Sequence, residues 1–359
     1  MKFNILDKVS FSISGLNGPM SLFLEEEYKF CIQGNDNVDR SKELFYVEIV
    51  EDKISNYAYK VRNPVVVDKK GVAISDYDGN LARIDFDKLD CSTYKVTCDK
   101  DFNQFFFANL LEYLICLGFI DLGYSFCHAS AFIRKGKTIL CPGWRNVGKT
   151  NLLLSFLKDG AEFLSDDWVL IDSNGSLFSL PKRINLLHYN YRPNMDTIKK
   201  FDPILSVFSD TILQIIEGNK YKYTDLSGTQ LKDSLKRRVH FEDLFKRDKV
   251  EKSENIDFIF FLNHDNAKDK VSINKCNIKN IKNRMIRILD YEQKPFKLAY
   301  DFYKFYTGKS SHLIDSARKI NDNVLSEAFR DTSKVFQIDI PDQNQSELIK
   351  QHIIRIVGQ

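Results

Sequence analysis

Thr138–Asp172 reads TILCPGWRNVGKTNLLLSFLKDGAEFLSDDWVLID, and this stretch decides the fold. Its apolar run at 139–141 predicts a strand, and the run at 151–157 predicts a helix that Gly160 is placed to end. A second apolar run at 168–171 predicts another strand. The order strand, glycine loop, helix and strand is the context in which phosphate-binding loops occur.

The loop fits the phosphate-binding pattern G-x-x-x-x-G-K-[ST] without a mismatch, and its residues are Gly143, Trp144, Arg145, Asn146, Val147, Gly148, Lys149 and Thr150. The two glycines permit backbone angles that let successive N–H groups point at phosphate oxygens, and the following helix adds its positive end. Lys149 can reach the β- and γ-phosphates, and the Thr150 hydroxyl suits Mg²⁺. The alternative is an ordinary Gly-Lys turn before a core helix, and the matching flanks favour the phosphate loop.

Two adjacent carboxylates, Asp166 and Asp167, stand at the head of the second strand. Burying a carboxylate pair is costly unless the pair has a role. One carboxylate can hold the Mg²⁺ that Thr150 also contacts, and the other can take a proton from an attacking hydroxyl. A surface turn is the alternative, because Asp-Asp pairs are common in loops.

A histidine, His128, lies in the apolar segment 124–133 that precedes the loop strand. The short polar segment 134–137 is placed to turn this strand back as a hairpin, which would bring His128 near the phosphate site. A lone histidine in an apolar strand is more often a core residue.

Other candidates follow the second strand. Lys182 and Arg183 can clamp phosphate or can be rim charges, and 188–194 is an aromatic and polar segment that can line a substrate groove. The basic cluster 236–238 fits a solvated charge run, with contact to nucleotide or to an acidic partner as the alternative.

The composition describes an ordinary soluble globular protein. The chain has 359 residues, 43% of them hydrophobic and 28% charged, and a net charge of +3, which indicates neither a nucleic-acid partner nor a charged membrane surface. Seven cysteines without a C-x-x-C pair argue against a zinc site and for a reducing compartment, and Cys116, Cys127 and Cys141 lie in apolar runs typical of buried thiols. No signal peptide or membrane span is expected, and we therefore expect a cytoplasmic location.

The length suggests more than one domain. We expect a β-rich N-terminal domain at 1–100, a connecting helix within 101–123, a nucleotide-binding domain at 124–294 and a mostly helical region at 295–359. The fold class is mixed α/β, or α+β. Within these parts, the apolar patterns predict a helix at 102–118, a strand at 256–262 and a closing helix at 346–357.

The order of three motifs resembles the HPr kinase/phosphorylase-like group, which shares its nucleotide-binding core with phosphoenolpyruvate carboxykinase. The motifs are His128-Ala129-Ser130, the loop, and Gly160 to Asp167, and they fall within 124–186. The resemblance implies a central mixed sheet packed between helices, with the loop at one end. It also implies ATP or another nucleoside triphosphate as phosphate donor, and Mg²⁺.

The resemblance assigns roles to residues at the matching positions. Lys149 and Thr150 would bind phosphate and Mg²⁺, and His128 would lie close to the transferred phosphate. Of Asp166 and Asp167, one would be the general base and the other would lie near the metal. We take Thr150 and Asp167 as the expected metal ligands, and which carboxylate is the base stays open.

The chain also departs from that group. Trp144-Arg145-Asn146 occupies loop positions where HPr kinases have a small Ser-Gly pair, so Trp144 can reshape the phosphate pocket and Arg145 can add a phosphate contact. Neither the N-terminal region nor a C-terminal signature of HPr kinases can be matched. These departures speak against the HPr protein as the acceptor.

The leading hypothesis is a kinase that transfers the γ-phosphate to a hydroxyl of a peptide, a protein or a small molecule such as a sugar. A nucleotide-binding accessory protein that holds a peptide or protein partner is the second hypothesis, and a simple nucleoside triphosphatase is the third. The intact Lys149, Thr150 and Asp166-Asp167 favour the enzyme. The oligomeric state stays open, a homo-oligomer included.

Overall fold

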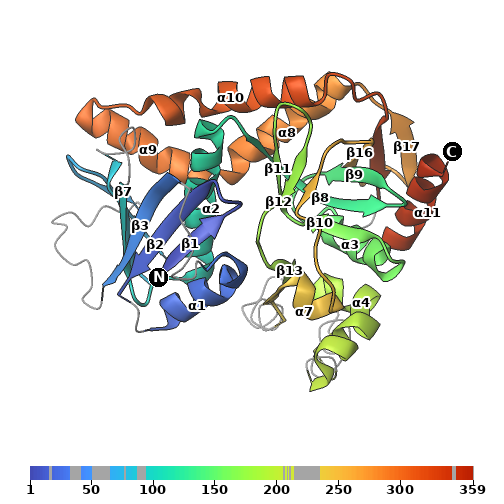
Figure 1. Ribbon diagram of the computed structural model, residues 1–359, viewed down its shortest axis with the longest axis horizontal. Coiled ribbons are helices and arrows are strands. Elements are labelled where there is room, and N and C mark those ends of the chain that lie inside the picture. The colour runs from blue at the N-terminus through green and yellow to red at the C-terminus, as the bar shows by residue number, and fades with distance from the viewer. Residues whose placement is uncertain are drawn as a thin grey trace. The chain divides into compact units, whose positions relative to one another are not determined.

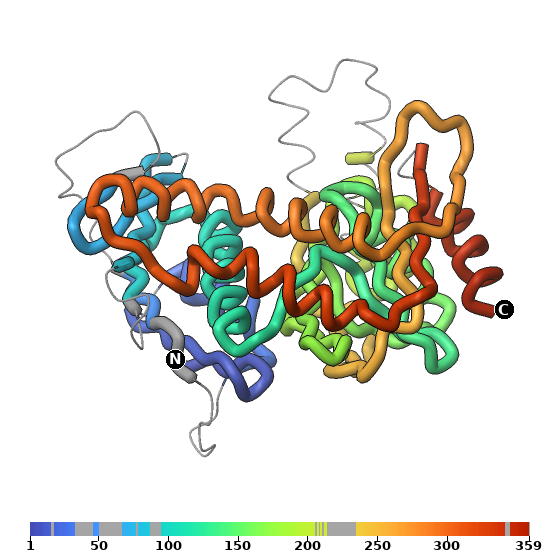
Figure 2. Tube along the Cα trace, turned by 90° about the horizontal axis from the view of Figure 1, so that it is seen from above, coloured from blue at the N-terminus to red at the C-terminus, as the bar shows by residue number. Residues whose placement is uncertain are grey.

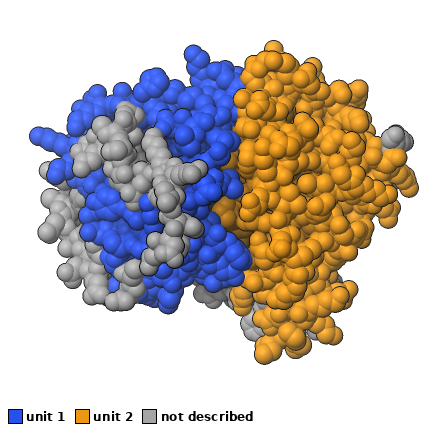
Figure 3. Space-filling model, viewed as in Figure 1, with its two compact units in different colours: residues 1–126, 289–324 blue, residues 127–288, 325–359 orange. Residues whose placement is uncertain are grey.

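The structure is a computed structural model of the chain, and it describes residues 1–15, 18–32, 42–50, 65–76, 78–86, 94–204, 207, 209, 212–213, 235–341 and 345–358. It divides into two compact units (Figure 3). Unit 1 comprises 1–126 and 289–324, and unit 2 comprises 127–288 and 325–359. The mixed α/β class predicted from the sequence is confirmed.

Unit 1 is built on a mixed sheet, seven-stranded in its described residues, with the strand order β1-β2-β3-β7-β6-β5-β4 (Figure 1). Strand β3 pairs in parallel with both β2 and β7, and the other neighbours are antiparallel. The strands are β1 (Lys2–Ile5), β2 (Val9–Ser14), β3 (Lys42–Val50), β4 (Val65–Val67), β5 (Val72–Ser75), β6 (Leu81–Ile84) and β7 (Tyr94–Asp99). The β-rich character expected for 1–100 is therefore present.

The helices that lie wholly within unit 1 are α1 (Pro19–Glu27), the 3₁₀ turn η1 (Lys29–Cys31), α2 (Gln104–Asp121) and α9 (Lys294–Thr307). The predicted helix at 102–118 is α2, which begins where Asn103 Oδ1 accepts the Phe106 N–H at 3.0 Å. Helix α9 ends at Gly308, and α10 (His312–Ala328) runs back beside it (Figure 2). Lys304 Nζ donates to Asp315 at 2.9 Å and joins the two helices.

Helix α2 is apolar on nearly all sides, which is why its buried residues form no single stripe. Among the described helices it is the one long and apolar enough to cross a membrane, and 72% of that segment is buried inside the protein. Such burial is typical of the core helix of a globular unit.

Unit 2 contains a second mixed sheet, nine-stranded in the residues that the structure describes. Its order is β15-β12-β11-β8-β9-β16-β18-β17, and β10 pairs with β8. The strands are β8 (Ser125–Arg134), β9 (Lys137–Pro142), β10 (Glu162–Ser165), β11 (Trp168–Ile171), β12 (Leu177–Ser179), β15 (Lys252–Ser253), β16 (Phe258–His264), β17 (Ser272–Lys275) and β18 (Val335–Ile340). A small separate ladder joins β13 (Ile184–Leu186) to β14 (Arg237–Val239).

Helices cover both faces of this sheet. The strand predicted at 256–262 is β16, and its side chains alternate between two cores, with Phe258 and Phe260 in one and Ile259 and Phe261 in the other. The first core includes α3 (Lys149–Lys158), α4 (His188–Phe201), α7 (Phe241–Phe245) and α11 (Ser346–Val357). The second includes α8 (Ile278–Glu292) and the end of α10. The closing helix predicted at 346–357 is α11.

The unit boundaries differ from those expected from the sequence. Residues 289–324 belong to unit 1 and 325–359 to unit 2, so the expected helical region 295–359 is shared between them. Helical periodicity shows that each helix has an apolar face, but it does not show which sheet that face covers. The predicted buried thiols Cys116, Cys127 and Cys141 are free and buried, whereas Cys91 lies outside the described residues.

Candidate active site

The glycine-rich loop 143–150 joins the end of β9 to the start of α3, as the sequence predicts. Gly143 forms a parallel bridge with Leu262 at the end of β16, and a Cβ on Gly143 would lie 2.8 Å from the Leu262 carbonyl oxygen. Gly148 precedes the helix with φ of 97°, a left-handed conformation that favours glycine. Both glycines are thus required by the backbone path.

Lys149 lies inside this loop and is buried, with 6% of its surface exposed. Its ammonium donates to the carbonyl oxygens of Gly143 at 3.1 Å and of Trp144 at 2.8 Å. These contacts hold the positive charge at the centre of the loop, where the N-terminus of α3 adds a field of the same sign.

The crest of the loop is exposed. Trp144 is 43% exposed, and Arg145 and Asn146 are also exposed, whereas Val147 is packed in the core beneath them. Asn146 has a left-handed φ of 57°, and its Oδ1 accepts a hydrogen bond from the Tyr189 hydroxyl at 2.8 Å. The predicted aromatic segment 188–194 therefore reaches the loop through the first turn of α4.

Asp166 lies directly beside the start of α3. The Thr150 hydroxyl donates to Asp166 Oδ2 at 3.0 Å. The other oxygen, Oδ1, is buried and has no hydrogen-bond partner among the described residues. Burial and the charge of Asp167 raise the Asp166 pKa to about 6.

The donor set of Thr150 and Asp166 fits Mg²⁺, which prefers hydroxyl and carboxylate oxygens and commonly takes few protein ligands beside substrate phosphates. An orphaned buried carboxylate oxygen next to a hydroxyl is the feature that such an ion would satisfy. Within the described part of the chain, no cluster of three or more His, Cys, Asp or Glu residues forms a metal cage.

Asp167 is held from two sides. His128 Nε2 lies 2.7 Å from Asp167 Oδ1, and Lys182 Nζ donates to Oδ2 at 2.7 Å. Burial alone would raise the Asp167 pKa, but the charge of Lys182 and the hydrogen bond from His128 outweigh it and hold that pKa well below its usual range. Because an ionised carboxylate only accepts hydrogen bonds, His128 carries its proton on Nε2.

The sheet order explains how these residues meet. Strand β8 lies between β9, which leads into the loop, and β11, which follows the two carboxylates. The Gly143 N–H donates to the His128 carbonyl at 3.3 Å, and the Ala129 N–H donates to the Asp167 carbonyl at 3.2 Å. The hairpin predicted between β8 and β9 is confirmed, with Ala129 opposite Pro142.

Asp167 adopts a left-handed φ of 69°, which is uncommon for a residue with a side chain. This conformation turns the chain between β10 and β11. It leaves the Asp167 side chain 31% exposed, whereas Asp166 is 6% exposed. Of the two neighbouring carboxylates, one is therefore open to a second reactant and the other is enclosed.

The sequence patterns did not reveal the polar network behind the loop. Asn151 Oδ1 accepts from Asn190 Nδ2 at 2.8 Å and from Asn194 Nδ2 at 3.2 Å, and all three side chains are buried. This network ties α3 to α4. Asparagines on helices usually mark exposed faces, so no signal in the sequence pointed to it.

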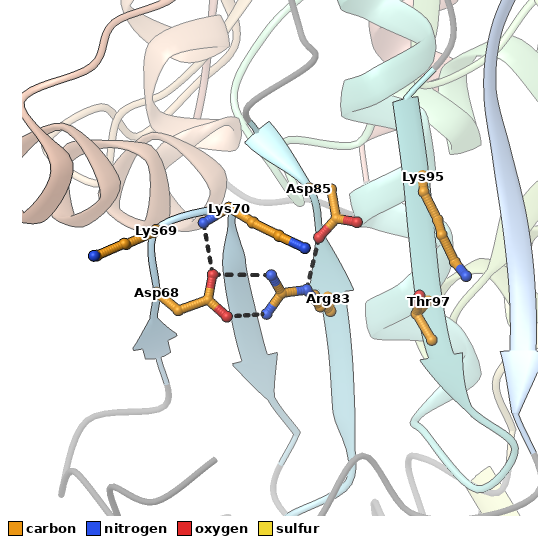
Figure 4. A pocket seen from close by; sticks show the side chains of 7 residues that line it. All are labelled: Asp68, Lys69, Lys70, Arg83, Asp85, Lys95 and Thr97. Atoms are coloured by element: carbon orange, nitrogen blue, oxygen red, sulfur yellow. Dashed lines mark hydrogen bonds and ion pairs between the residues drawn. The ribbon is translucent and has the colours of Figure 1, made fainter. Parts of the chain in front are cut away.

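Unit 1 has a second charged region, an open groove of about 580 Å³ (Figure 4). At its centre the Arg83 guanidinium donates to both oxygens of Asp68, at 2.8 and 2.9 Å, and to Asp85 at 2.7 Å. Its lining residues are Asp68, Lys69, Lys70, Arg83, Asp85, Lys95 and Thr97. Since Asp68 also accepts the backbone N–H groups of Lys70 and Gly71, this group clamps the turn after β4 onto β6.

No protein-family model matches this sequence, and no curated protein matches it. The resemblance to the HPr kinase/phosphorylase-like group therefore rests on the residues named above and stays a prediction.

Proposed function

We propose that this protein is a P-loop kinase of the HPr kinase-like type, which transfers the γ-phosphate of ATP or another nucleoside triphosphate to a hydroxyl. One observation carries the proposal. The loop lysine, the loop threonine, His128 and the carboxylate pair come from separate segments and meet at one edge of the sheet in unit 2. Phosphoryl transfer needs this combination of groups that bind phosphate, a metal site and a base.

The two carboxylates have different roles in this proposal. The contact between Thr150 and Asp166, and the orphaned Asp166 Oδ1, support Asp166 as the metal ligand in place of Asp167. When bound, Mg²⁺ would offset the charge of the β- and γ-phosphate oxygens. The loop N–H groups and Lys149 would bind the same phosphates.

Asp167 is the base, because its side chain can be reached by an acceptor. The acceptor oxygen forms a bond to the γ-phosphorus, the bond from that phosphorus to the β–γ bridging oxygen breaks, and the acceptor proton passes to Asp167. The nucleoside diphosphate leaves. His128 fixes the orientation of the carboxylate through Oδ1. The acceptor class is a peptide or protein serine, or a small molecule such as a sugar.

A second function, nucleotide binding without transfer, is favoured by a different observation. Both oxygens of Asp167 accept strong hydrogen bonds from cationic or polar donors, and the Asp167 pKa is held low, which weakens it as a base. In that case the protein would be an accessory that binds nucleotide and holds a peptide or protein partner.

Label transfer from γ-labelled ATP separates the two functions. The purified protein is incubated with Mg²⁺ and panels of hydroxyl-bearing peptides and sugars, beside Asp167→Asn, Lys149→Met and the matched surface control Asp269→Asn. Transfer by the wild type and the control, lost in the two site variants, supports the kinase. Nucleotide binding with no transfer to any acceptor supports the accessory function.

A further inference from the structure

Lys182 is a second lysine in the proposed phosphate site, outside the glycine-rich loop. It lies in the segment between β12 and β13, and its side chain is only 5% exposed. Burial of an ammonium is costly unless a partner compensates it, and Asp167 Oδ2, 2.7 Å from Nζ, is such a partner.

The two lysines of the site are held in different ways. Lys149 donates to neutral carbonyl oxygens of its own loop, whereas Lys182 donates to a carboxylate. Lys182 contacts Asp167 directly, and Lys149 precedes Thr150, whose hydroxyl donates to Asp166. The carboxylate pair is thus reached by one cationic residue of the β12–β13 segment and adjoins the cationic residue of the loop.

This arrangement conflicts with transfer as it stands. Each oxygen of Asp167 keeps a second lone pair for the acceptor hydroxyl, but the donors His128 on Oδ1 and Lys182 on Oδ2 lower the basicity of the carboxylate. Of the two donors, the lysine is a point charge on a flexible stem, and it can move its hydrogen bond to another nearby anion. A terminal phosphate offers several acceptor oxygens and more negative charge than one carboxylate.

We infer that Lys182 is a ligand of the terminal phosphate, which distinguishes a nucleoside triphosphate from a diphosphate and leaves Asp167 Oδ2 for the acceptor when the triphosphate is bound. This inference rests on the proposed phosphate site. It makes Lys182 a specificity residue of that site and couples the presence of a transferable phosphate to the availability of the base.

The test compares dissociation constants for ATP and ADP, each with Mg²⁺, by calorimetry. Lys182→Met is expected to weaken ATP binding at least about tenfold, the effect of losing a charge-assisted hydrogen bond, and to leave ADP binding within about twofold. Lys149→Met should weaken both nucleotides. Lys182→Arg should recover part of the preference for ATP, and the exposed control Lys270→Met should bind both nucleotides like the wild type.

Asp167→Asn is expected to change ATP affinity in the opposite direction from Lys182→Met. It removes the carboxylate charge that competes with phosphate for Lys182, so ATP binding should become tighter than in the wild type while ADP binding stays the same. If Lys182→Met fails to fold because Asp167 is left without its cation, the double variant Lys182→Met/Asp167→Asn removes both charges together. It should bind ATP and ADP with nearly equal affinity.

Equal loss of ATP and ADP affinity in Lys182→Met or the double variant, or no loss in either, would overturn the inference. That outcome is distinct from failure of the kinase proposal. Transfer activity with an unchanged ATP preference in Lys182→Met rejects the role of Lys182 alone, and a selective loss of ATP affinity without any transfer supports the role in a protein that only binds nucleotide.

Discussion

The Arg83 cluster of unit 1 and the Asp166-Asp167 cluster of unit 2 both pair a cation with acidic groups, but they differ in how fully their polar atoms are satisfied. Arg83 donates in a fork to Asp68 and once more to Asp85. In unit 2 an oxygen of Asp166 is buried with no partner among the described residues, and Asp167 has a left-handed backbone. A satisfied cluster holds a turn in place, whereas an unsatisfied and strained one indicates a site for another molecule.

The largest expected effect is in unit 2, on phosphate binding. Lys149→Met removes the charge that the loop holds at its centre, and label transfer should fall by at least about 10². Arg83→Met, the corresponding loss in unit 1, should leave the transfer rate of the folded protein unchanged. A comparable loss in both variants would contradict the division between a structural and a functional cluster.

Asp166→Asn should affect metal use and stability in opposite directions. The Mg²⁺ concentration required for half-maximal transfer should rise at least about tenfold, because a ligand charge is lost. In the absence of metal and nucleotide the variant should be more stable than the wild type above pH 7, by up to about 3 kcal/mol, since the charged form of Asp166 is disfavoured by burial. A Mg²⁺ titration of label transfer measures the first effect, and urea unfolding without metal or nucleotide measures the second.

The difference in unfolding free energy between wild type and Asp166→Asn should depend on pH in a defined direction. The folded protein binds the Asp166 proton more tightly than the unfolded chain does, because the pKa rises from 3.8 to about 6. The stabilisation is present below pH 3.8 and is lost as the pH rises through about 6. The lowered pKa of Asp167 makes the unfolding free energy depend on pH only below the unfolded pKa of 3.8, where stability falls as the pH falls. Wild type and Asp166→Asn should therefore diverge between about pH 4 and 6, and parallel profiles would reject the assignment.

In unit 1, Arg83→Lys should cost about 1–2 kcal/mol of unfolding free energy, because a lysine cannot reproduce the forked contact with Asp68. The Asp68 side chain is 39% exposed, which limits the effect. Equilibrium denaturation measures the loss, and Lys69→Arg, at an exposed position on the same groove, is the matched control. A loss as large in the control would indicate a general charge effect.

The smallest expected effect is the acid response of Asp68. Its pKa is lowered to about 2, since the cost of its partial burial is outweighed by Arg83 and the backbone N–H groups of Lys70 and Gly71. The resulting stabilisation is present above pH 3.8 and is lost as the pH falls toward 2. Asp68→Asn should flatten this part of the stability profile of unit 1, and an unchanged slope would place the acid sensitivity elsewhere.

Local patterns predicted much of this fold because they depend on nearby residues. The order around 138–172 predicted β9, the loop, α3 and β11, and the polar segment 134–137 between two apolar runs predicted the β8–β9 hairpin. The return of 289–324 to unit 1 could not be predicted, because an apolar helix face does not specify its partner. The pairing of Lys182 with Asp167 depends on tertiary contacts. The sequence alone could therefore not decide whether Lys182 binds phosphate or is an ordinary charge at the rim of the site.

The two-residue turn at Lys135 and Gly136 has a consequence for how this protein can diverge. Both residues have positive φ, and the turn fixes the register in which β8 faces β9. Ala129 and Ala131 face one core and Phe132 the other, so a shift of one residue would point His128 to the opposite side of the sheet. An insertion or deletion of one residue within β8, between His128 and this turn, would therefore remove the histidine side chain from the site.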